Sequence, residues 1–157
     1  MAIDKVRAYF DTFSIADRII EFDVSSATVE LAAQALNVAG QRIAKTLSFR
    51  KEDGCLLVVT AGDAKVDNAK FKQTFQMKAR MLSPDDAFRL IGHAVGGICP
   101  FAVNEGIDIY LDVSLRRFAT VFPACGSSNS AIELTLQELE FYAQARQWVD
   151  VCALPIE

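Results

Sequence analysis

Two short segments carry residues that could take part in chemistry, and the first is a lysine within a predicted strand. The strand covers residues 43–50. Alternation of side chains along a strand places Lys45 on the same face as Ile43, Leu47 and Phe49, which is the more apolar face. Burying an unpaired ammonium group is costly. Lys45 therefore either extends to solvent at the strand end or points into a polar cavity, where it could hold an anion.

The second segment is the glycine-rich stretch of residues 92–100, which contains a Gly-Gly pair and ends in Pro100. Adjacent glycines let peptide N–H groups turn toward a ligand without side-chain obstruction, and such groups bind anions or a developing oxyanion. The candidate N–H groups belong to Gly96, Gly97, Ile98 and Cys99. Neither the phosphate-loop pattern nor the dinucleotide-binding pattern of glycines is present in the sequence.

A third segment, residues 124–130, is rich in small hydrogen-bonding residues and is either a simple turn or the lining of a pocket. The residues that would line such a pocket are Gly126, Ser127, Ser128 and Asn129. The sequence has one histidine, His93, and no G-x-S-x-G motif, which argues against a Ser-His-Asp hydrolase. A thiol nucleophile formed by Cys99 or Cys125 with His93 is possible in principle, although nothing in the sequence shows that they meet.

Composition narrows the class of protein. With 52% hydrophobic and 23% charged residues in 157, we expect one globular domain over residues 1–157. The four cysteines form no C-x-x-C pair, so we expect free thiols, no metal and no cofactor. No apolar run approaches the roughly 20 residues of a membrane span, and no apolar signal core follows the N-terminal charges. These features predict a cytoplasmic protein with no membrane partner.

The formal net charge of −4 argues against a protein that coats nucleic acid by bulk attraction. The charge is unevenly distributed, however, because residues 65–80 are predominantly basic. This stretch contains Lys65, Lys70, Lys72, Lys78 and Arg80 against a single acid, Asp67. It is either a solvated helix face or a surface that meets phosphates.

The pattern of elements predicts an α+β fold. Helices are expected at residues 4–13, 28–36, from 67 past Phe75, 83–91 and 137–145, and strands at 19–23, 43–50, 56–59, 107–113, 118–122, 131–134 and 148–152. Asp53-Gly54 predicts a hairpin between the second and third of these strands. Several consecutive strands lack an intervening helix, which favours a curved mixed sheet or partial β-barrel surrounded by helices over a doubly wound parallel sheet.

The lysine strand followed by the glycine loop resembles the YbaK/prolyl-tRNA synthetase-associated editing domains. Residues 43–50 resemble the lysine-bearing strand of that family, and residues 96–100 fit its G-x-x-x-P loop. The predicted helix at residues 28–36 precedes the lysine as it does in the family, and the likeness extends from about residue 19 to the C-terminus. Cys99 departs from the small residue that many relatives carry there, which leaves the amino-acid preference of the pocket open.

The resemblance implies hydrolysis of mischarged aminoacyl-tRNA, with alanine or cysteine wrongly attached to tRNA for proline. In that interpretation Lys45 and the peptide groups of Gly96, Gly97, Ile98 and Cys99 form the catalytic site. The substrate-binding candidates are His93, Pro100, Gly126, Ser127, Ser128 and Asn129, and Lys65, Lys70 and Lys72 would meet tRNA phosphates. The implied partner is the mischarged acceptor end of tRNA, with a prolyl-tRNA synthetase as a second candidate; the oligomeric state is not predicted. A non-catalytic module that binds tRNA, an aminoacyl-adenylate or a synthetase remains an alternative.

Overall fold

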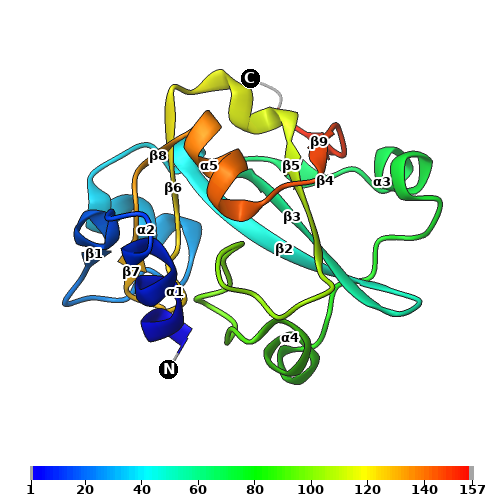
Figure 1. Cartoon of the computed structure of the whole chain (residues 1–157). Coiled ribbons are helices and arrows are strands. Elements are labelled where there is room, and N and C mark those ends of the chain that lie inside the picture. Colours follow the sequence, from blue (N-terminus) through cyan, green and yellow to red (C-terminus); the bar gives the residue numbers. More distant parts are fainter. Residues whose placement is uncertain (1, 156–157) are drawn as a thin grey trace.

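The fold is a curled, six-stranded mixed sheet with helices around it, in a computed structural model that describes residues 2–155 (Figure 1). The strand order is β8-β6-β2-β3-β5-β9. These strands are β2 (Ile43–Lys51), β3 (Gly54–Ala61), β5 (Asp108–Asp112), β6 (Thr120–Pro123), β8 (Leu134–Thr135) and β9 (Gln147–Val149). The sheet mixes parallel and antiparallel pairs, so the prediction of a curved mixed sheet, and not a doubly wound parallel one, is confirmed.

The β2–β3 hairpin forms the centre of the sheet. Its antiparallel register runs from Ala44↔Ala61 to Lys51↔Gly54, as the Asp53-Gly54 turn signal predicted. Every residue of β3 after Gly54 is buried, because helices and loops cover both faces of this strand. Phe49 of β2 packs on Phe71 with ring centroids 4.7 Å apart, which joins the hairpin to the helix that follows it.

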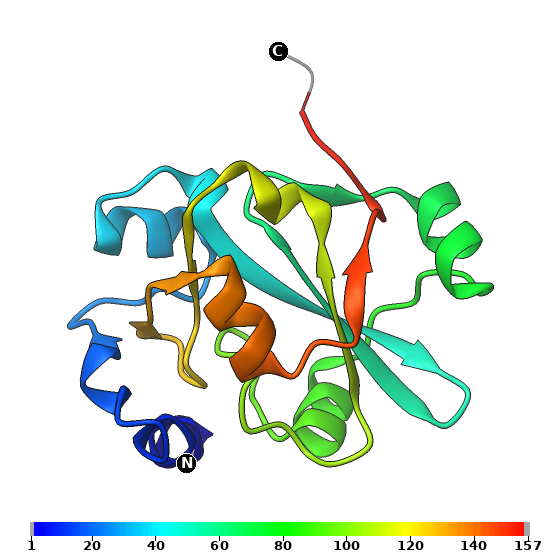
Figure 2. The same cartoon turned by 45° about the horizontal axis from the view of Figure 1, so that its top comes forward.

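The helices begin where the sequence offers N-caps. They are α1 (Ala2–Asp11), α2 (Val29–Leu36), α3 (Asn68–Phe75), α4 (Pro84–Ile91) and α5 (Leu136–Ala143). Thr28, Asp67 and Ser83 accept hydrogen bonds from backbone N–H groups at the starts of α2, α3 and α4, and Thr135 forms a capping box with Glu138 in α5. Figure 2 shows α2 and α3 at opposite ends of the sheet and α5 lying across it.

Several predicted strands are shorter than expected. The strand at 19–23 is only β1 (Ile20–Glu21), which pairs with β7 (Ser130–Ala131). The predicted strand at 131–134 is split between β7 and β8, and that at 148–152 between β9 and β10 (Cys152–Ala153). β10 leaves the main sheet to pair with β4 (Lys65–Val66). The apolar pattern located these segments but could not show that each changes its partner within a few residues.

The remaining ordered segments are three 3₁₀ helices, at Ala16–Arg18, Gly40–Arg42 and Val113–Arg117. The first helix begins and ends about two residues earlier than predicted, at Ala2–Asp11, and its Val6 and Phe10 are fully buried. Among residues 2–155, no helix is long and apolar enough to cross a membrane.

Candidate functional site

A cavity of about 420 Å³ lies beside β2, between α2, the start of α4 and the glycine-rich loop. Lys45, Gly96 and Ile98 all line it, so residues that are about 50 positions apart in sequence share one pocket. No aspartate or glutamate is among its lining residues in the described part of the chain. Lys45 is the one charged residue among the lining residues in the described part of the chain, and a positive charge near the cavity favours an anionic or electron-rich ligand.

The ammonium group of Lys45 is held by the turn between β3 and β4. Its Nζ atom donates to the carbonyl oxygen of Ala64 at 2.6 Å and to that of Gly62 at 3.4 Å. Lys45 is part-buried, and burial lowers its pKa below the ordinary value for lysine. An ammonium has three N–H donors, so these two carbonyl oxygens leave one donor without a partner among the described residues. The Lys45 side chain is thus held by the protein and not free in bulk solvent, and its hydrogen-bond donors are not all used by protein carbonyl groups.

The glycine loop offers peptide N–H groups on the other side of the cavity. The N–H of Gly97 donates to the carbonyl oxygen of Ala94 at 3.0 Å and is therefore occupied. Within residues 2–155, the N–H groups of Gly96, Ile98 and Cys99 have no hydrogen-bond acceptor. Gly96 and Ile98 line the cavity, whereas Gly97 and Cys99 do not. The loop can thus supply N–H donors, but fewer than the sequence pattern suggested.

The loop at residues 126–129 supports the glycine loop. A Cβ atom on Gly97 would lie 2.7 Å from the backbone nitrogen of Ser127, so only glycine allows this approach. Gly96 faces Ser128, since a Cβ there would lie 3.6 Å from the Ser128 Cβ. Asn129 donates from its side chain to the carbonyl oxygen of Phe22 at 3.0 Å. Gly126, Ser127, Ser128 and Asn129 do not line the cavity, although the following Ser130 and Ala131 do.

His93 and Cys99 meet in the core, at 3.6 Å between Nε2 and Sγ. Both are fully buried, and burial raises the pKa of the Cys99 thiol to about 12. His93 Nε2 lies 2.8 Å from the carbonyl oxygen of Phe101, which can only accept, so Nε2 carries the proton and cannot take one from the thiol. Burial also lowers the pKa of His93. This pair lacks the thiolate that a nucleophile needs. Cys125 is likewise buried, and its pKa is raised well above the usual value.

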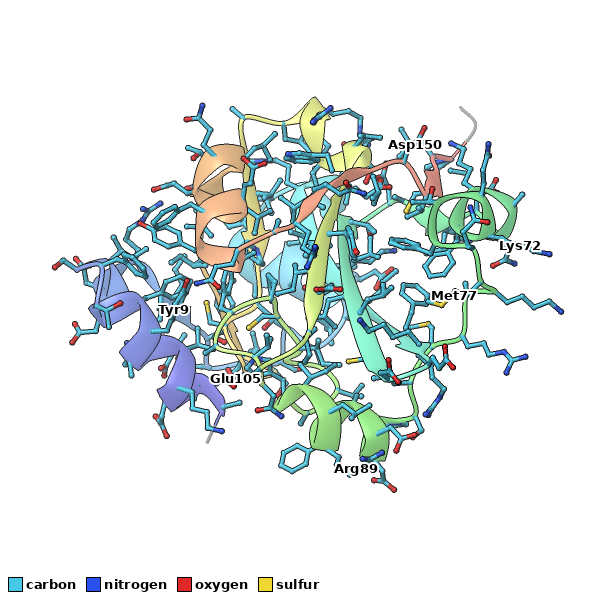
Figure 3. The ribbon with its side chains drawn as sticks, turned by 45° about the vertical axis from the view of Figure 1, so that its right-hand side comes forward. Tyr9, Lys72, Met77, Arg89, Glu105 and Asp150 are labelled. Carbon is cyan, nitrogen blue, oxygen red and sulfur yellow. The ribbon has the colours of Figure 1, made fainter. Side chains whose placement is uncertain are left out.

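The other predicted residues lie outside the cavity. Pro100 borders a second hollow, beside Tyr9 and Tyr142. Lys70 donates to Asp150 at 3.1 Å and to the carbonyl oxygen of Cys152 at 3.0 Å. Lys72 projects outward from α3, far from α4 (Figure 3). Lys65, in β4, is exposed and close enough to Lys45 to lower its pKa further.

Sequence reasoning missed several residues that line the cavity, notably Ser26, Thr46 and Met81. Alternation assigned Thr46 to the face opposite Lys45, but both reach the cavity because it lies along the edge of β2 and not over one face. Within the described residues, the hydroxyl groups of Ser26 and Thr46 are buried without a hydrogen-bond partner. No local pattern in the sequence marks an edge of this kind.

The model for the aminoacyl-tRNA editing domain matches residues 24–142, which include the whole lysine strand and the glycine loop. The chain belongs to the aminoacyl-tRNA editing domain family. This confirms the resemblance inferred from the lysine strand and the loop. The matched region includes the cavity-lining residues of α2, β2 and α4.

Individual relatives agree with this assignment. The chain is 53% identical over 153 residues to the uncharacterized protein YwhH of Bacillus subtilis (strain 168), covering 97% of this chain and 98% of that one. It is 28% identical over 103 residues to a proline–tRNA ligase of Geobacillus sp. (strain WCH70), of which it spans only 18%. A solved structure described as a "putative trans-editing enzyme for prolyl tRNA synthetase" superposes with a TM-score of 0.87 at 27% identity, covering 97% of each chain.

Proposed function

We propose that this protein is an aminoacyl-tRNA deacylase that hydrolyses mischarged tRNA in trans, with cysteine or alanine on tRNA for proline as substrate. The observation that carries the proposal is the convergence of Lys45, Gly96 and Ile98 on one cavity without carboxylates among its lining residues in the described part of the chain. The membership of the editing family and the likeness to a described trans-editing protein over 97% of both chains support it. Its place would be the cytoplasm, where tRNA is charged.

The chemistry needs positioning more than a nucleophile. A synthetase distinguishes small amino acids by only about 1–3 kcal/mol per methylene group, so errors require a second, hydrolytic step. The aminoacyl ester is already reactive, and an enzyme can accelerate its hydrolysis by orienting the ester and stabilising the oxyanion. In this proposal the free N–H groups of Gly96 and Ile98 hold the ester carbonyl. The attacking water loses its proton to a hydroxyl or amine of the substrate.

Lys45 has the role of holding the terminal adenosine phosphate or orienting the ester. Its remaining N–H donor is suited to an oxygen of the substrate, since its other two donors already have carbonyl partners. Farther from the cavity, Lys65 and Lys72 are exposed and could meet tRNA phosphates, whereas Lys70 would first have to leave Asp150. A prolyl-tRNA synthetase that supplies the mischarged tRNA is a second proposed partner.

The test is deacylation of cysteinyl- and alanyl-tRNA for proline by the wild type, Lys45→Ala and Lys51→Ala. Lys51 is a matched control because it lies in the same strand but pairs with Asp108 at 3.4 Å, away from the cavity. We expect the wild type and Lys51→Ala to clear at least one substrate and Lys45→Ala to lose about 100-fold or more, in the range seen when a transition-state donor is removed. A wild type that clears neither substrate, or a fully active Lys45→Ala variant, would contradict the proposal.

The rival is a module of the same fold that binds charged tRNA without chemistry. It would retain mischarged tRNA in a filter-binding assay while leaving the ester intact at the spontaneous rate. The salt dependence of tRNA binding shows which lysines contact phosphates. Removing one lysine that neutralises a phosphate makes the slope of log affinity against log salt concentration shallower by about 0.7–0.9. We expect Lys65→Ala and Lys72→Ala to reduce this slope more than Lys70→Ala.

A further inference from the structure

The edge of β2 that faces the cavity has a gap in its strand pairing. β6 pairs with β2 only at Ile43 and Ala44. The chain next returns to this edge at Ser48, whose carbonyl oxygen accepts from the N–H of Leu82 at 3.2 Å. The backbone N–H of Arg50 then donates to the carbonyl oxygen of Arg80 at 2.7 Å. Between Ala44, where the pairing with β6 ends, and Ser48, no backbone group of residues 2–155 pairs with this edge of β2.

Strand geometry identifies which residue is left open. The N–H and C=O groups of one residue point to the same edge of a strand, and those of the next residue point to the opposite edge. Ser48 and Arg50 bond outward, away from β3, so Thr46 must also face outward. Its backbone N–H and C=O therefore lie at the gap. Thr46 is half-buried and lines the cavity, so a ligand bound there can pair with these backbone groups.

The size of the gap fits one amino-acid unit. Ala44 and Ser48 are four residues apart, which is about 13 Å along a strand. This length leaves a single outward-facing residue, and the gap is therefore too short to accept an added strand. The side-chain hydroxyl of Thr46 is also buried and without a partner among the described residues. The gap thus offers an N–H donor, a carbonyl acceptor and a hydroxyl to a small ligand.

We infer that the backbone of Thr46, at this gap, binds the α-amino group of the aminoacyl ester through its carbonyl oxygen. This inference rests on the proposed function and names the part of the substrate that the gap receives. Because no carboxylate lines the cavity within the described residues, an amine must be received by neutral acceptors. The nearby positive charge of Lys45 favours the uncharged amine, which still donates an N–H. The site thereby requires a free α-amino group on the acyl chain.

The first experiment measures binding without hydrolysis. The probes are two adenosine 3′-amides, one carrying an alanyl group and one a propionyl group, which lacks only the amine. We expect the alanyl compound to bind the full chain about tenfold more tightly, as one hydrogen bond of about 1.4 kcal/mol would give. The NMR signal of the Thr46 carbonyl carbon should shift with the alanyl compound alone. Equal affinities, an unmoved Thr46 signal, or no binding of either compound would overturn the inference.

The result separates this inference from the proposed function. Selective binding of the alanyl compound at Thr46, with no deacylation of mischarged tRNA, would reject the deacylase and retain the amine site. The opposite result is equal deacylation of alanyl-tRNA and N-acetyl-alanyl-tRNA, with each enzymatic rate divided by the spontaneous rate of the same substrate. It would retain the deacylase and reject the amine site. We expect acetylation to reduce this ratio at least tenfold.

A pair of proline variants tests the gap itself. Proline removes an N–H, and strands tolerate it only where that N–H is unpaired. Thr46→Pro should therefore remain folded, with a loss of melting temperature less than half that of Leu47→Pro, whose N–H faces β3. Its ring would enter the cavity and abolish binding of the alanyl compound. Equal destabilisation by the two variants would show that the Thr46 N–H is paired and would overturn the inference.

Discussion

The Lys45 ammonium nitrogen lies 2.6 Å from the carbonyl oxygen of Ala64, across the mouth of the β2–β3 hairpin. Burial lowers the pKa of Lys45, so the fold holds a charge whose burial costs stability. We expect Lys45→Met to unfold within about 1 kcal/mol of the wild type at pH 7, because the lost hydrogen bonds and the relieved desolvation oppose each other. The same variant should lose deacylation. Chemical denaturation beside the tRNA assay measures both.

The pH dependence of this comparison has a definite sign. A lysine whose pKa is lower in the folded than in the unfolded state costs stability while it is protonated. That cost is present at neutral pH and disappears as the pH rises through the folded value toward the ordinary one. The free energy of unfolding of the wild type should therefore increase relative to that of Lys45→Met as the pH rises. A difference that grows in favour of Lys45→Met would mean that Lys45 is stabilised, and not strained, by its position.

Cys99 should be dispensable for chemistry. Its buried thiol has a pKa of about 12 and the neighbouring His93 nitrogen carries a proton, so no thiolate forms near neutral pH. We expect Cys99→Ala to keep deacylation within about threefold and to lose about 1 kcal/mol of stability from the space it leaves. Iodoacetamide at pH 8 should not inactivate the folded protein. Loss of activity in Cys99→Ser together with full activity in Lys45→Ala would instead indicate a thiol enzyme.

The sequence predicted the parts of the site that depend on local geometry. Lys45 in a strand, the turn signal of Asp53-Gly54 and the Gly96-Gly97 pair were each recognised from spacing, and the order of strands favoured the mixed sheet. Each of these features is determined by neighbours within a few residues. Family resemblance then linked the lysine to the loop, and the structure brings Lys45 and Gly96 to the same cavity.

What the sequence could not predict depends on contacts between distant segments. The occupied N–H of Gly97, the carbonyl partners of Lys45 and the gap beside Thr46 all arise where chain segments meet without a local signal. The 126–129 loop was expected to be either a turn or a pocket lining, and it packs behind the glycine loop. Strand alternation grouped Thr46 with Ala44 and Ser48, and all three line the cavity, but alternation could not show that a cavity lies at this edge of the strand.

Acid should weaken the attachment of α5. Arg18 and Glu138 form an ion pair at 2.7 Å, and this pairing lowers the pKa of Glu138 to about 2. A lowered carboxyl pKa contributes stability above the unfolded value of 4.5, and this is lost as the pH falls from there to about 2. Both side chains are about one-third exposed, so the contribution is about 1 kcal/mol or less. We expect Glu138→Gln to be less stable than the wild type at pH 7 and equally stable near pH 2, in urea titrations at both values. A constant difference would contradict this origin.

The contact between the two loops behind the cavity should not tolerate a side chain at Gly97. A Cβ atom there would lie 2.7–2.8 Å from three backbone atoms of Ser127, and backbone cannot move aside as a flexible side chain can. We expect Gly97→Ala to displace the loop that carries the Gly96 and Ile98 N–H groups, to cost about 1–3 kcal/mol of stability and to reduce deacylation by at least tenfold.

Gly106→Ala is the matched control, because its φ of +83° strains any side chain but no atom lies within 4 Å of the added Cβ. It should lose about 1 kcal/mol and keep its activity, since Gly106 lies outside the cavity. If both variants lose stability equally and both stay active, the close approach of Gly97 to Ser127 does not position the loop.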